Sequence, residues 1–247
     1  MVDKERFERI CELFSLHNDV TSGFSTYNEK RLHMILKRLI SSNEEHYEQK
    51  VGNFVADVFD GERIYEIQTA SLYPLKKKLE YYLRESEYPI SVIKPFIASK
   101  RLVRVEIESG EVLRCRRSPK KAGDAELFTE LYKISDFLSD PRLEVVVLYV
   151  DADEYRYSDE IVRYRKRGKY DAELFPRALI EEKRFCGAHS FEYLLDSVPN
   201  KFTAKEYGTF SGLSGRGLYS LLNLLCKLSL LKREKTDDGI YEYTKIK

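Results

Sequence analysis

The sequence predicts an α/β protein followed by a smaller helical module. Two observations carry this prediction. Segments with helical and strand periodicity follow one another as helix, three strands, helix, strand over residues 25–98. A second group of helical segments, ending in a short strand pair, lies within residues 174–247. We therefore expect one domain over residues 1–170 and another over residues 174–247.

The first elements are defined by apolar spacing and by turn residues. Residues 3–16 form an amphipathic helix pattern, and Thr26 or Asn28 is expected to cap a second helix that extends to Ile40. Three strands should follow, joined at two turns. They are predicted at residues 46–51, 54–59 and 63–69, with the turns at Gly52-Asn53 and Asp60-Gly61.

The next segments complete the first domain. Ser71 is expected to cap a helix with Leu72, Leu75 and Leu79 on its apolar face. A buried strand, a hairpin around Ser109-Gly110, a helix and a strongly apolar strand should follow. Their ranges are 89–97, 101–117, 124–138 and 143–150. The highly charged residues 151–170 are predicted to be an extension or linker.

The C-terminal segment has the order of a winged-helix module. A helix near residues 189–197 precedes a short helix capped by Thr203, a longer helix at 215–229 and a two-stranded ribbon. Residues 201–247 hold nine Lys and Arg against five Asp and Glu, so the segment is modestly basic. Arg216, at the start of the longer helix, is a candidate nucleic-acid contact. A protein-binding role for the module stays open.

Composition excludes several classes of protein. The chain has 247 residues, and its 42 Lys and Arg against 41 Asp and Glu give a net charge of +1, so any electrostatic argument for nucleic acid must be local. Four scattered cysteines without a CxxC pair argue against a zinc module or a disulfide framework. Because no signal core or membrane-spanning stretch is present, we expect a cytoplasmic protein without membrane contact.

Acidic side chains gather on the strands at 54–59 and 63–69. A two-residue turn at Asp60-Gly61 would place Asp57 opposite Ile64 and Glu66 diagonal to Asp57, with Gln68 following on the same face. Crowded carboxylates repel unless a cation or proton lies between them, and oxygen ligands suit Mg²⁺. The pattern therefore indicates a metal site, with a solvated hairpin face as the alternative.

Other polar residues nearby carry weaker signals. Glu48 is a second candidate ligand, although an exposed strand glutamate is the simpler interpretation. Lys76, Lys77 and Lys78 are candidate phosphate contacts. His33 has no partner at ligand spacing and is expected to be structural.

Glu29, Asp57 and the Glu66-Ile67-Gln68 triplet, in this order of elements, resemble the PD-(D/E)XK nuclease superfamily. The resemblance covers about residues 25–98 and implies the restriction-endonuclease-like αβββαβ core with a mixed sheet. It also implies that Glu29, Asp57 and Glu66 hold Mg²⁺ or Mn²⁺, which activates water against a phosphodiester.

Two positions depart from the pattern of that superfamily. Gln68 stands where lysine usually orients the attacking water, and Ala56 rather than proline precedes Asp57. Glutamine can still position a water by hydrogen bonding, but it carries no positive charge. Gln68 therefore keeps a catalytic role in this interpretation, as the residue that orients the nucleophile.

A basic run lies in the predicted hairpin and after it. Phosphate contacts by such residues release counterions and make binding depend on salt, whereas a solvated face is the alternative. The candidate nucleic-acid contacts are Arg114, Arg116, Arg117, Lys120 and Lys121.

Together these features predict a metal-dependent nuclease that hydrolyses phosphodiester bonds in nucleic acid, with DNA as the expected substrate. The alternative is a catalytically inactive nuclease-fold protein that binds DNA as a regulator or serves as a protein adaptor. Nucleases of the resembled fold often dimerise, so a homodimer stays open as well.

Overall fold

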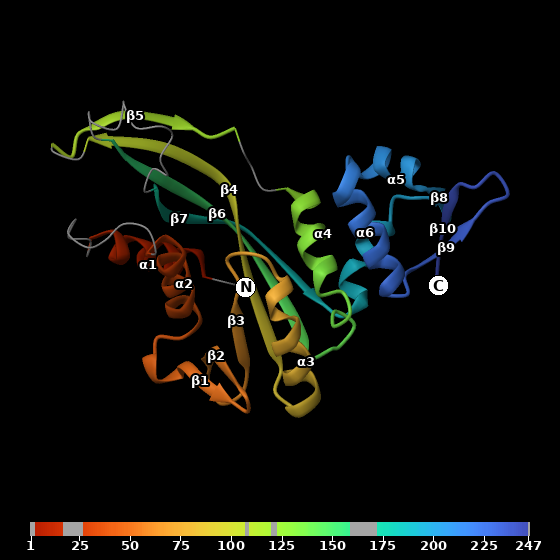
Figure 1. The fold of residues 1–247 in the computed structure, drawn as a ribbon, viewed down its shortest axis with the longest axis horizontal. Helices are drawn as coiled ribbons and strands as arrows, with labels where there is room; N and C mark the ends of the chain where they lie inside the picture. The colour runs from red at the N-terminus through yellow and green to blue at the C-terminus, as the bar shows by residue number, and fades with distance from the viewer. Residues whose placement is uncertain (1–2, 17–26, 107–108, 120–122, 159–171, 247) are drawn as a thin grey trace.

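The computed structural model describes residues 3–16, 27–106, 109–119, 123–158 and 172–246. In these residues the fold is mixed α/β, as predicted, and is built around a seven-stranded sheet in the order β1-β2-β3-β4-β6-β7, with β5 paired to β4 (Figure 1). The strands are β1 (Tyr47–Val51), β2 (Phe54–Phe59), β3 (Ile64–Ile67), β4 (Ile90–Glu106), β5 (Val112–Arg117), β6 (Leu143–Ser158) and β7 (Ala172–Cys186). Strand β4 runs parallel to β3 and β6, and the other neighbours are antiparallel.

Helices cover both faces of the sheet. Helices α1 (Lys4–Leu16) and α2 (Tyr27–Ile40) pack on one face, and α3 (Lys76–Glu85) and α4 (Asp124–Lys133) on the other (Figure 1). Strand β6 alternates between the two layers. Val145 and Val147 join the α3–α4 cluster, whereas Val146 joins the α1–α2 cluster. A strand buried on both faces has a continuous apolar sequence, which explains the run at 143–150.

Strands β4 and β6 extend beyond their predicted ends. Residues 151–158 continue β6, so the predicted linker is wrong there, while residues 159–171 lie outside the described part of the chain. The charged residues of this extension form ion pairs across the strands. Arg101 of β4, for example, donates to both oxygens of Asp153 of β6 at 2.7 and 2.5 Å. Strand β7 was not predicted from the sequence.

The β2–β3 hairpin has a different turn from the predicted one. Val58 pairs with Tyr65 and Phe59 with Ile64, which leaves residues 60–63 as the loop. The Asp60 carboxylate stabilises this loop by accepting hydrogen bonds from the backbone amides of Glu62 and Arg63 at 2.9 and 2.8 Å. The two-residue turn is therefore wrong.

Two predicted helix caps have different outcomes. Helix α3 begins only after the 3-10 turn Tyr73–Leu75, and Ser71 accepts instead from the backbone amide of Tyr73, so Ser71 is not its cap. Thr203 does cap its helix. Its hydroxyl accepts from the Glu206 amide, and the Glu206 carboxylate accepts from the Thr203 amide in return.

The tail adds a small sheet and further helices. A 3-10 helix, η4 (Ala188–Leu195), leads into β8 (Lys201–Thr203), α5 (Ala204–Ser211), α6 (Gly215–Lys227), β9 (Leu231–Lys235) and β10 (Tyr241–Lys245). The three strands are antiparallel in the order β8-β10-β9. The predicted ribbon is present, and β8 is an addition to it.

Helix α6 packs closely against α4. Leu221 and Leu225 of α6 belong to the same buried cluster as Leu131 of α4, so the core continues from the large sheet into the tail. Gly217 permits this approach, since a Cβ atom at this position would lie 2.6 Å from the Cα of Ala125. The obstacle is backbone, which cannot swing aside as a flexible side chain would.

We expect Gly217→Ala to destabilise the protein by about 1–3 kcal/mol, because the added methyl group overpacks the α4–α6 contact. Alanine is the better helix former, so helix propensity alone predicts the opposite sign. Urea denaturation measures the difference. Arg216→Ala, at the exposed neighbouring position, is the control and should change stability by less than about 0.5 kcal/mol. A stabilised Gly217→Ala variant would contradict the close contact.

Candidate active site

Asp57 and Glu66 lie at opposing positions just beyond the β2–β3 ladder. The last paired residues are Val58 and Tyr65, so Asp57 and Glu66 occupy the next opposing positions. The Asp57 Oδ2 atom accepts a hydrogen bond from the backbone amide of Ile67 at 2.6 Å. The Asp57 side chain therefore binds the backbone amide of the residue that follows Glu66.

Glu66 is almost completely buried between β3 and α3. The Nζ atom of Lys78 donates to its two oxygens at 3.0 and 2.8 Å, and the Tyr82 hydroxyl donates to Oε1 at 3.2 Å. The exposed fraction of Glu66 is 1%. Burial raises the pKa of Glu66 to about 7, and the charge of Asp57 adds to this rise, whereas Lys78 and Tyr82 act against it.

Asp57 has the opposite electrostatic character. Burial works to raise its pKa, but hydrogen bonds from His33 and from the Ile67 amide outweigh burial and lower the pKa below the usual aspartate range. His33 Nε2 of α2 lies 3.3 Å from Oδ1. Two neighbouring carboxyl groups therefore differ in proton affinity. One is held ionised and the other titrates near neutrality, a division of roles that acid–base sites use.

Helix α2 supports a third carboxylate close by. Glu48 of β1 lies between the pairs Tyr47–Val58 and Gln49–Ala56, and therefore opposite Asp57. Its φ angle is 51°, a left-handed conformation that non-glycine residues rarely adopt. Its carboxylate forms an ion pair with Lys37 of α2. His33 and Lys37, one helical turn apart, thus both bind acids of the β1–β2 hairpin.

The remaining predicted site residues are Gln68, two residues after Glu66, and Glu29 of α2. Gln68 follows β3 directly, is partly buried and donates its backbone amide to Ile93 O at 2.9 Å. Glu29 lies in the first turn of α2, four residues before His33, and its side chain is outside the described part of the structure. The buried Lys94 of β4 holds the segment after Gln68 by donating to the carbonyl of Thr69 at 3.0 Å.

Sequence reasoning undervalued Lys78, Tyr82 and His33. His33 was expected to be a structural histidine, and its partner is the predicted site residue Asp57. Lys78 and Tyr82 are four residues apart on α3, so both reach one carboxylate on the strand beneath. That spacing was visible in the sequence, but the partner on β3 was not.

The donor set is compatible with a hard divalent cation. Among the described residues no group of three or more His, Cys, Asp or Glu side chains is arranged to hold a metal. Mg²⁺ commonly binds through only one or two protein carboxylates and keeps water and phosphate oxygens as its other ligands. Asp57 and Glu66 could supply two such carboxylates, and Lys78 forms an ion pair with Glu66 at 2.8 Å.

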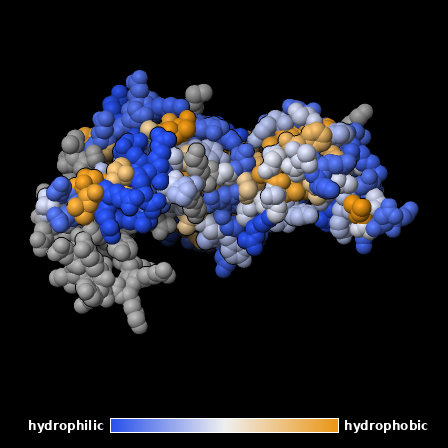
Figure 2. Space-filling model, turned by 90° about the horizontal axis from the view of Figure 1, so that it is seen from above, coloured by the Kyte–Doolittle hydropathy of each residue, from blue (hydrophilic) through white to orange (hydrophobic). Residues whose placement is uncertain are grey.

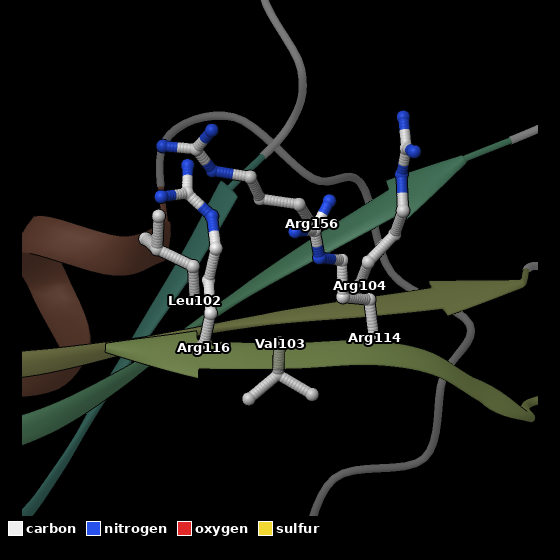
Figure 3. Close-up of a pocket in the computed structure, with 6 residues that line it drawn as sticks. All are labelled: Leu102, Val103, Arg104, Arg114, Arg116 and Arg156. Carbon is white, nitrogen blue, oxygen red and sulfur yellow. The ribbon is translucent and has the colours of Figure 1, made fainter. Parts of the chain in front are cut away.

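The predicted basic residues lie in different parts of the fold. Arg114 and Arg116 share one face of β5, and by strand alternation Arg117 lies on the other, opposite Arg101 (Figure 3). Arg216 is exposed at the start of α6, in the tail. Lys120 and Lys121 lie outside the described residues.

A protein family matches the part of the chain that carries these features. Domain of unknown function DUF8091 matches residues 30–186, from α2 to the last residue of β7. The chain belongs to the DUF8091 family. The DUF8091 segment includes Asp57, Glu66 and Lys78 as well as the arginines of β5, and it stops before the tail.

A bacterial protein is similar to this chain over most of its length. An uncharacterized protein of Treponema pallidum (strain Nichols) is 28% identical over 187 residues, which are 74% of this chain and 72% of that protein. No solved structure matches the chain significantly. None of the described helices is long and apolar enough to cross a membrane.

We expect Glu66→Gln to stabilise the metal-free protein more at pH 8 than at pH 5. The folded-state pKa of Glu66, about 7, lies above the ordinary value of 4.5, so stability is lost as the pH rises through this range. Glutamine stays neutral and avoids that loss, which amounts to as much as about 3 kcal/mol.

Thermal unfolding in EDTA at the two pH values measures the effect. Glu62→Gln replaces an exposed carboxylate in the loop of the same hairpin and serves as the control, with little change at either pH. An advantage of Glu66→Gln that shrinks from pH 5 to pH 8 would show that Glu66 is not held in a raised-pKa state.

Proposed function

We propose that this DUF8091 protein is a divalent-metal-dependent nuclease acting on DNA. The observation that carries the proposal is the placement of Asp57 and Glu66 at opposing positions just beyond the β2–β3 ladder, with the ammonium group of Lys78 bound to Glu66. Further support comes from the order α2–β1–β2–β3–α3–β4, with β3 parallel to β4. This is the αβββαβ order of the PD-(D/E)XK nucleases that the sequence resembles.

Each residue has a role that its surroundings favour. Asp57 is held ionised by His33 and the Ile67 amide and would be the permanent metal ligand. Glu66 would be the second ligand once it has lost its proton, and Glu29 would complete the site or hold a water. The bound metal would supply Lewis acidity and lower the pKa of a water molecule.

Lys78 would take the part that lysine at position 68 has in the resembled family. Its ammonium group donates to both Glu66 oxygens and, at 2.8 Å, to the carbonyl of Val55. A cation fixed beside a metal-binding carboxylate is placed to face the phosphate under attack and to stabilise the developing negative charge. Gln68 would then orient the nucleophilic water by hydrogen bonding.

The tail would act as a winged-helix module. The elements η4, β8, α5, α6, β9 and β10 follow one another in the order of that module. Helix α6 packs against α4, so its free surface is a narrow stripe that includes the exposed Arg216 and Tyr219. Contact with DNA through this stripe or through the β9–β10 ribbon would position the substrate.

A catalytically inactive DNA-binding or adaptor protein is the second candidate. It is favoured by one observation, namely that Lys78 already provides a positive charge for Glu66, while position 68 has no lysine. A site of this kind would be stable without metal and would have lost its need for one.

Metal binding distinguishes the two candidates. We expect the wild type to bind Mn²⁺ in calorimetric titration, and Asp57→Asn and Glu66→Gln each to abolish this binding and Mg²⁺-dependent cleavage of DNA. Circular dichroism checks that both variants remain folded. Equal cleavage by variants and wild type would exclude these residues from the mechanism, and absence of Mn²⁺ binding by the wild type would favour the inactive candidate.

Lys78→Ala should lower the cleavage rate by about 100-fold or more, because it removes a fixed cation beside the reacting phosphate. Lys77→Ala is the matched control, since Lys77 is the exposed neighbour on the same helix. Single-turnover cleavage measures both variants. A Lys78→Ala enzyme as fast as the Lys77→Ala enzyme would remove Lys78 from catalysis.

A further inference from the structure

Four arginines converge on one face of the extension formed by β4, β5 and β6. Arg104 of β4 pairs in register with Arg114 of β5 on one side and with Arg156 of β6 on the other. Arg116 lies two residues from Arg114 on the same face, and all four side chains point away from the side occupied by Val103 (Figure 3). Together with Leu102, they line a hollow of about 220 Å³. We call these four residues the arginine cluster.

Little negative charge offsets the cluster. Glu154 binds Arg156 at 2.5 Å and also pairs with Lys100. Among the described residues, no carboxylate forms an ion pair with Arg104, Arg114 or Arg116. The four arginines, Lys100 and Glu154 together carry a charge of +4. Like charges on directly opposed strand positions are destabilising, so the cluster costs the fold stability unless an anion binds there.

The chemistry of the cluster best fits a polyanion with regularly spaced phosphates as its ligand. Guanidinium groups match phosphate oxygens in a bidentate manner, and several of them in a row suit a backbone better than one small anion. Strand β5 is exposed along its whole length, and the surface at this end of the molecule is mainly hydrophilic (Figure 2). Among the described residues, the β5 side of the cluster is therefore open to solvent.

Strand β4 connects the arginine cluster with the neighbourhood of Glu66. Glu66 pairs with Val92 of β4, and Arg104 lies twelve residues farther along the same strand. At about 3.3 Å per residue the separation along the strand is roughly 40 Å, and the curvature of the strand shortens the direct path. One turn of B-form DNA is about 34–36 Å long. A duplex along β4 would bring phosphates about one turn apart to the two places.

We propose that the arginine cluster binds the backbone of double-stranded DNA about one helical turn from the bond that is cut. The one-turn distance to the cut bond rests on the proposed nuclease function, whereas the binding of DNA to the cluster does not. The cluster would hold the substrate in register and would contribute to affinity without reading its sequence.

The binding experiment uses the full chain with Asp57→Asn, in EDTA, so that no cleavage occurs. Arg104, Arg114 and Arg116 are replaced together by alanine, and fluorescence anisotropy follows binding of a 30-base-pair DNA duplex over a salt series. We expect affinity to fall at least tenfold at 100 mM salt. The slope of log K against log salt should fall by about 3, because each lost phosphate contact removes about 0.9.

The control replaces three exposed cations elsewhere, Arg9, Lys50 and Arg84, and therefore changes the net charge equally. Its affinity and salt slope should stay close to those of the parent. Equal losses of affinity in the two triple variants would show that only net charge matters and would overturn the proposal. Tighter arginine-dependent binding of single-stranded DNA than of the duplex would overturn it as well. If the alanine variant does not fold by circular dichroism, the corresponding triple glutamine variant is measured instead.

Cleavage tests the spacing in the otherwise wild-type chain. The triple variant should lose at least tenfold in kcat/KM on a 30-base-pair duplex and little on a duplex of 8 base pairs, which is too short to reach both places. Equal loss on both lengths would overturn the one-turn spacing. If the unaltered protein cleaves neither duplex, the nuclease proposal fails, and the anisotropy result alone decides the binding role.

Discussion

The ion pair between Glu66 and Lys78 is the interaction on which the candidate site depends. A carboxylate buried under α3 is costly unless a counter-charge and hydrogen bonds accompany it, and α3 supplies both through Lys78 and Tyr82. The same contacts fix the helix over β3. Because Asp57 is bound separately by α2 and by the Ile67 amide, two helices on opposite faces of the sheet determine the state of one acidic pair.

Opposite charges are separated along a single sheet. The acidic pair lies at the end of the β2–β3 ladder, and the arginine cluster lies on the outer extension of β4, β5 and β6. This separation explains why a chain with a net charge of +1 still has a strongly basic face. The length of β4 sets the distance between the two, so the strand acts as a spacer as well as a core element.

Local signals in the sequence found the elements with clear periodicity or caps. The strands at 54–59 and 143–150 and the Thr203 cap are examples, and Asp57 and Glu66 were identified as neighbours. The errors arose where partners are distant. Residues 151–158 look like a linker because their charges are neutralised across strands by residues such as Arg101, some fifty positions away. The contacts of Lys78 and His33 likewise depend on tertiary packing, and the Asp60 side chain shifted the hairpin register.

The close contact at Gly217 has a mechanical consequence. Helices α4 and α6 approach closely at Gly217 and share a packed core, which leaves little space for one helix to rotate against the other. The shared core therefore ties the position of the tail to that of α4. In the proposed DNA complex, a load on the β9–β10 ribbon would be passed through α6 to α4.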